Sequence, residues 1–113
     1  MTTHRRLDLS GVRVTVMGLG VHGGGLSVTR FAVEAGAEVT VTDLRSEEAL
    51  RESLDRLPEK SRVVLGRHER DDFMHTDLVV KNPAVPRTVP LLDEAPAVTG
   101  DIALFFAAWD RST

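Results

Sequence analysis

Apolar residues follow two periods that alternate along this chain. Valine takes every second position over residues 12–17, which predicts a β-strand with one buried face. Over residues 28–35 the apolar positions are spaced by three and four, which predicts a helix with one buried stripe. The same reasoning predicts further strands at 38–42, 62–65, 78–80 and 97–98, and further helices at 46–57, at 89–95 and from Asp101 onward.

Local signals indicate where several of these helices begin and end. Gly36 follows the first helix at the place where a left-handed residue is preferred. Ser46 is a suitable N-cap for the second helix, and Pro58 ends it. No element is predicted within the polar stretch 67–77.

The last predicted helix has a strongly apolar face. Its residues Ile102, Phe105, Phe106 and Trp109 follow the spacing of one helical stripe. Either this face packs on the sheet of its own domain, or part of it was meant for another domain and forms an exposed patch.

Strands that alternate with helices through short connections predict an α/β fold with a parallel, doubly wound sheet. We expect one Rossmann-like, three-layer domain of about five strands in the order 3-2-1-4-5. The domain is expected to occupy residues 11–108, after an N-terminal tail of residues 1–10.

Composition excludes several kinds of function. The net charge is −3 and no basic run occurs, so nucleic acid is not an expected partner. The absence of cysteine excludes disulfides, Cys-ligated zinc and a thiol nucleophile. Neither a secretory leader nor a membrane-length apolar run is present, so we expect a cytoplasmic protein without a membrane partner.

The first strand leads directly into a glycine-rich turn with the pattern G-x-G-x-x-G. Gly18 permits the tight turn, Gly20 removes a Cβ where a phosphate must approach, and Gly23 allows helix and strand to pack closely. The start of the following helix offers unpaired N–H groups to an anion. The alternative is a flexible glycine loop that holds no ligand.

Asp43 ends the second predicted strand, where dinucleotide folds place an acid that accepts hydrogen bonds from ribose. It could instead only turn the chain into the next helix. Arg45 and His22 could each meet an anionic ligand or remain solvated. His4, His68 and His75 lack metal-ligand spacing and are interpreted as surface residues. No catalytic residue and no metal site is predicted.

Three further segments carry a resemblance to a known family. Gly24-Gly25 follows the turn, 81–86 reads Lys-Asn-Pro-Ala-Val-Pro, and 99–105 reads Thr-Gly-Asp-Ile-Ala-Leu-Phe. In this order they resemble the N-terminal, UDP-binding domain of UDP-N-acetylmuramoyl-L-alanine:D-glutamate ligase, a Mur ligase. The resemblance extends over residues 12–106.

The resemblance implies a set of substrate contacts. The turn would bind the UDP moiety, the segment after the second strand would face uracil and ribose, and the loop after the fourth strand would close over the nucleotide. Leu44 stands where the family often has a polar residue, and Ala84 where it usually has glycine; Ala84 would be strained if its φ were positive. The implied contact residues are Gly18, Gly20, Val21, His22, Gly23, Asp43, Leu44, Arg45, Asn82, Pro83 and Ala84.

The resemblance also implies a reaction of peptidoglycan biosynthesis, which serves the cell wall, cell shape and cell division. The substrate partner would be UDP-N-acetylmuramoyl-L-alanine, while ATP and magnesium would bind a central domain and D-glutamate a C-terminal domain. We expect no cofactor in this domain, a linker beginning at 109–113, and no activity of this chain alone. The alternative function is an NAD(P)-binding module of a dehydrogenase or a channel regulatory subunit.

Overall fold

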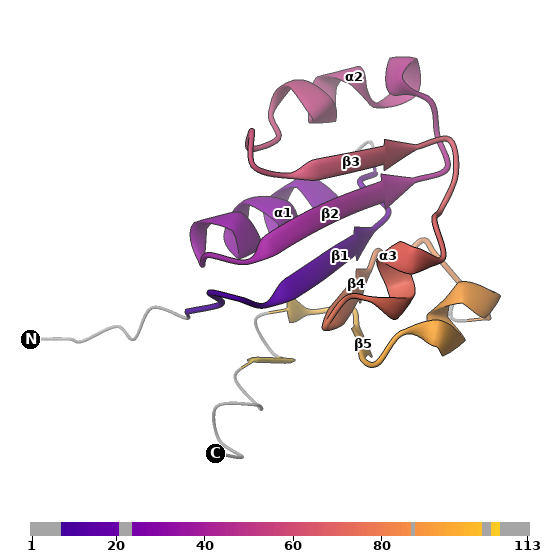
Figure 1. The fold of residues 1–113 in the computed structure, drawn as a ribbon. Helices are drawn as coiled ribbons and strands as arrows, with labels where there is room; N and C mark the ends of the chain where they lie inside the picture. The colour runs from indigo at the N-terminus through magenta and orange to yellow at the C-terminus, as the bar shows by residue number, and fades with distance from the viewer. Residues whose placement is uncertain (1–7, 21–23, 87, 103–104, 107–113) are drawn as a thin grey trace, which may run out of the picture.

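The computed structural model describes residues 8–20, 24–86, 88–102 and 105–106. Five parallel strands form one sheet in the order β3-β2-β1-β4-β5, which confirms the predicted fold class and strand order (Figure 1). The elements are β1 (Arg13–Met17), α1 (Gly24–Glu34), β2 (Glu38–Asp43), α2 (Glu47–Asp55), β3 (Arg62–Leu65), α3 (Asp71–Met74), β4 (Leu78–Lys81), the 3₁₀ helix η1 (Pro90–Glu94) and β5 (Val98–Thr99).

Helices cover both faces of this sheet, and each face has its own apolar core. On one face, α1 and α2 pack against the valines of β1 and β2. On the other face, α3 and η1 pack on Met17 and Val79, through Phe73 and Leu92. Buried residues of the first core are Leu9, Val14, Val16, Leu19, Leu26, Ala32, Val39, Val41, Leu50, Leu78, Val80, Ile102 and Phe106.

The helix ends predicted at Gly36 and Ser46 are present in the structure, whereas α2 ends at Asp55 and not at the predicted residue 57. Gly36 has a φ of 98°, the left-handed conformation that a C-terminal glycine supplies at no steric cost. The Ser46 side chain accepts a hydrogen bond from the Ala49 N–H at 3.3 Å, so it is the N-cap of α2. No helix within the described ranges is long and apolar enough to cross a membrane.

Three predicted boundaries were wrong. The stretch 67–77 contains a one-turn helix, α3, where no element was predicted. The helix expected at 89–95 is the shorter 3₁₀ segment η1, and β5 lies one residue later than expected. Leu9 precedes the strand β1 and packs against the domain: it is only 2% exposed, and its N–H donates to the Ala35 carbonyl at 2.7 Å.

The described part of the last apolar face packs on the domain itself. Ile102 and Phe106 are buried in the first core, and Phe105 packs against that core with its ring edge toward Phe106. This contact favours the first of the two alternatives for these residues. Trp109 lies outside the described residues.

Candidate functional site

Three loops meet at the carboxyl edge of the sheet. They follow β1, β2 and β4, and they begin at Gly18, Leu44 and Asn82. β1 pairs with β2 on one side and with β4 on the other. The connection after β1 covers one face of the sheet, whereas the connection after β4 covers the opposite face. This is the topological switch point, where open α/β sheets bind their ligands.

The turn after β1 needs its glycines for steric reasons. Gly18 and Gly20 have φ values of 94° and 74°, which L-residues rarely adopt. A Cβ on Gly18 would also lie 2.8 Å from the Asn82 Cβ. The close approach of helix to strand falls on Gly25, where a Cβ would lie 2.5 Å from the Gly18 carbonyl oxygen and 2.6 Å from the Leu19 Cα. The sequence motif had placed that role at Gly23.

Three of the predicted contact residues cannot be placed. Val21, His22 and Gly23 lie outside the described residues, between the end of the turn and the start of α1. Their assignment to the substrate site stays a prediction.

Asp43 holds the turn from the neighbouring strand. Its Oδ2 accepts hydrogen bonds from the N–H groups of Leu19 at 2.9 Å and Gly20 at 3.3 Å. Its Oδ1 accepts from the Arg45 N–H at 2.8 Å, and the residue is only 6% exposed. Asp43 therefore joins the loops after β1 and β2, a structural role that neither sequence interpretation had described.

Most described amides of the turn donate within the protein. Besides the two that donate to Asp43, the Gly18 N–H donates to the Thr42 carbonyl at 2.8 Å, and the Gly25 N–H donates to the Leu19 carbonyl at 3.0 Å. Within the described ranges only Gly24 contributes an amide at this turn that is not used in this way. The number of amides that could meet an anion is therefore smaller than the sequence motif suggested.

The loop after β4 is fastened to the glycine turn. The Asn82 side chain donates to the Gly18 carbonyl at 3.3 Å and accepts from the Ala84 N–H at 2.9 Å. Ala84 and Pro83 are exposed. Since no described residue other than glycine has a positive φ, the strain considered for Ala84 does not arise.

The two residues after Asp43 face solvent. Leu44 is 65% exposed, an unusual position for a large apolar side chain, and Arg45 is exposed beside it. Both lie at the same edge as the glycine turn, and ligand contacts for them remain a prediction.

His68 belongs to this edge, although the sequence interpretation placed it on the surface. It is half-buried, with its ring edge-to-face against Phe73 and its Nδ1 2.7 Å from the Thr42 Oγ1. The Thr42 hydroxyl also lies 3.1 Å from the Arg67 carbonyl, which can only accept, so all three groups are satisfied when His68 donates from Nδ1. Burial lowers the pKa of His68, and the Asp43 carboxylate partly opposes this.

The lowered pKa of His68 predicts a loss of stability in acid. The unfolded chain binds the proton more tightly, so the free energy of unfolding is expected to fall as pH drops below about 6.5. Urea titrations between pH 7.5 and 5.5 test this. His68→Gln should reduce the loss, whereas His75→Gln is the control and should not, because His75 is the exposed residue that follows α3. Equal acid sensitivity of wild type and His68→Gln would contradict the assignment.

Within the described residues, no group of three or more His, Asp or Glu side chains could hold a metal ion. The features that distinguish this edge are the positive φ values of the turn glycines, the buried carboxylate of Asp43 and the side-chain amide of Asn82.

The fold and the arrangement of this edge are those of the class of Rossmann-like α/β domains. Residues 12–103 match the family model described as "Mur ligase MurD-like, N-terminal domain". The chain belongs to this family.

Several similar curated proteins carry the name UDP-N-acetylmuramoylalanine--D-glutamate ligase. The protein from Roseiflexus sp. (strain RS-1) is 50% identical over 99 residues, covering 87% of this chain and 21% of its own length. The protein from Treponema pallidum is 52% identical over 82 residues, covering 71% of this chain and 15% of its own length. The protein from Borreliella burgdorferi (strain ZS7) is 40% identical over 101 residues, covering 87% of this chain and 22% of its own length. The chain thus spans about a fifth of the length of these relatives.

Solved structures support the fold alone. Shikimate dehydrogenase from Aquifex aeolicus superposes with a TM-score of 0.56 at 16% identity, covering 82% of this chain and 44% of its own. A short-chain dehydrogenase from Mycobacterium smegmatis superposes with a TM-score of 0.51 at 21% identity, covering 81% and 46%.

Proposed function

We propose that this domain anchors UDP-N-acetylmuramoyl-L-alanine for a ligase that adds D-glutamate to it in peptidoglycan synthesis. The carboxyl-edge site is the observation that carries the proposal. There, two positive-φ glycines keep side chains away from the turn, while Asp43 and Asn82 hold it from both sides. The names of the relatives support the choice of substrate.

The proposed binding mode divides the ligand among the three loops. The diphosphate lies over Gly18, Gly20 and the segment 21–23, next to the N-terminus of α1. The uracil and ribose lie against the segment 43–45, with Leu44 offering an apolar surface and Arg45 a cation. The loop of Asn82, Pro83 and Ala84 covers the nucleotide from the side of β4.

Asp43 holds the glycine turn in place, and this role uses the carboxylate oxygens that would otherwise accept from ribose. Both carboxylate oxygens accept hydrogen bonds from backbone amides, and little of the residue is exposed. An NAD-type site uses an acid at this position to accept from ribose hydroxyls. The contacts of Asp43 therefore assign it a structural role in either kind of nucleotide site, and the choice of the UDP-sugar rests on the names of the relatives.

The chemistry of the whole ligase is also part of the proposal. ATP and magnesium would act in other domains, and the present chain would bind the substrate in the cytoplasm without turning it over. In this proposal the domain supplies binding and orientation of the substrate.

A thermal-shift panel tests the proposed ligand. UDP-N-acetylmuramoyl-L-alanine at 100 times its Kd should stabilise the domain by about 2.7 kcal/mol. This corresponds to a rise in Tm on the order of 10 °C. UDP should give a smaller rise at the same concentration, and NADH and NADPH none. Stabilisation by NADH alone would overturn the proposal in favour of the dehydrogenase-type module.

A further inference from the structure

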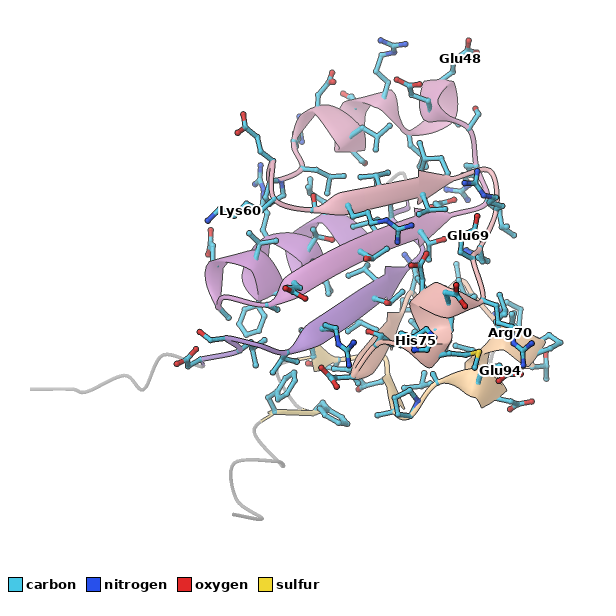
Figure 2. The ribbon with its side chains drawn as sticks, in the orientation of Figure 1. Glu48, Lys60, Glu69, Arg70, His75 and Glu94 are labelled. Atoms are coloured by element: carbon cyan, nitrogen blue, oxygen red, sulfur yellow. The ribbon has the colours of Figure 1, made fainter. Side chains whose placement is uncertain are left out.

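Lys81 is a buried cation at the edge of the sheet that carries the proposed site. It is the last residue of β4, is paired in register with Met17, and is only 8% exposed. The other lysine of the chain, Lys60, is exposed just before β3, at the opposite edge of the sheet (Figure 2). Lys81 is therefore buried and Lys60 is exposed, so Lys60 can serve as the control for substitutions of Lys81.

The Lys81 ammonium bonds only to neutral groups in the described structure. Its Nζ donates to the Val85 carbonyl at 2.6 Å and to the Asn82 carbonyl at 3.2 Å. Among the ion pairs between described residues, none involves Lys81. A buried charge without a counter-charge is costly, and an apolar residue of similar length would fill the same space without that cost. With no counter-charge among the described residues, the Lys81 ammonium is suited to an anionic partner that comes from outside the chain.

The local charges explain why such a site needs a cation. Asp43 places a buried negative charge on the amides of the glycine turn, and this charge repels a diphosphate. Asn82 connects the two sides, because its carbonyl accepts from Lys81 while its side chain donates to Gly18. Lys81 therefore holds the segment that touches the turn, and it brings a positive charge to the same edge.

We propose that Lys81 is a positioning and affinity-determining residue for the diphosphate of the ligand. It fastens the segment 82–85 against the glycine turn through Val85 and Asn82, and its charge offsets that of Asp43 when the anion binds. This inference rests on the proposed function, since it requires a diphosphate at the turn.

Calorimetry with UDP and with uridine separates the charge of Lys81 from its packing. Lys81→Met keeps the length of the side chain and removes the charge. It should weaken UDP binding about 10-fold or more, the range for a hydrogen bond to a charged group. Binding of uridine, which lacks phosphate, should weaken clearly less than that of UDP, and Lys60→Met should bind both ligands as the wild type does.

Lysine-selective ¹⁵N labelling gives a second measurement that uses the unmodified protein. The ammonium signal of Lys81 should shift during a UDP titration, whereas that of Lys60 should not. Unchanged UDP affinity of Lys81→Met, or an equal loss for UDP and uridine, would overturn the inference while leaving the proposed function intact. Failure of the wild type to bind UDP would overturn both.

Discussion

Gly25→Ala is expected to destabilise the domain by about 3 kcal/mol or more, the upper range for overpacking. The added Cβ would lie 2.5 to 2.6 Å from three backbone atoms of Gly18 and Leu19. Backbone atoms cannot rotate away as a side chain can, so α1 would have to separate from the end of β1. Thermal unfolding should show a fall in Tm of roughly 10–15 °C.

The adjacent glycine provides the control for this substitution. A Cβ on Gly24 would meet only the Asn82 Nδ2, at 3.9 Å, which is an ordinary contact. Alanine also favours a helix over glycine by up to about 1 kcal/mol. Gly24→Ala should therefore leave stability unchanged or slightly higher. Equal stability of the two variants would show that the close contact between α1 and β1 is absent in solution.

Asp43→Ala is expected to have the second-largest effect, on both stability and binding. It removes the acceptor for the N–H groups of Leu19 and Gly20, as well as that of Arg45. The Leu19 N–H is the buried donor of the three, and leaving it without a partner costs about 1–3 kcal/mol, so a loss of about that size is expected. The loosened turn should also bind UDP at least about 10-fold more weakly, which calorimetry below the Tm of the variant can measure.

Asp55→Ala is the matched control, because Asp55 is an exposed carboxylate at the end of α2. Its removal should change stability by no more than about 0.5 kcal/mol. If Asp43→Ala were as stable as Asp55→Ala, the carboxylate would not hold the turn. If it were destabilised but bound UDP normally, the turn would not be the anchor of the ligand.

Much of the fold could be predicted because the strands differ sharply from their surroundings. The valines of β1 and the apolar run of β4 are typical of strands. Between these two strands, a capping residue such as Ser46 marks the start of a helix. Helix α3 could not be predicted in this way, because its four residues are too few to show a period. It depends on Phe73, which is fully buried against the second face of the sheet, so tertiary packing decides its structure.

The meeting of Gly18 and Asp43 at one edge of the sheet could be predicted from the sequence, but the hydrogen bonds between them could not. The positions of Gly18 and Asp43 at the ends of two strands placed them at one edge. The hydrogen bonds from the turn to Asp43 join residues 24 and 23 positions apart, so they depend on how β1 and β2 align. The contacts of His68 were missed for the same reason, since Thr42 and Phe73 lie on other elements. Those of Lys81 were missed because Asn82 and Val85 lie in a loop that has no periodic pattern.

A titration of the ¹⁵N-labelled domain with UDP-N-acetylmuramoyl-L-alanine tests the central claim most directly, because it reports on each backbone amide. The account predicts the largest chemical-shift changes in residues 18–25, 43–45 and 82–84, with small changes at the amino ends of β1, β2 and β3. The largest changes at those amino ends, or no change at saturating ligand, would contradict it.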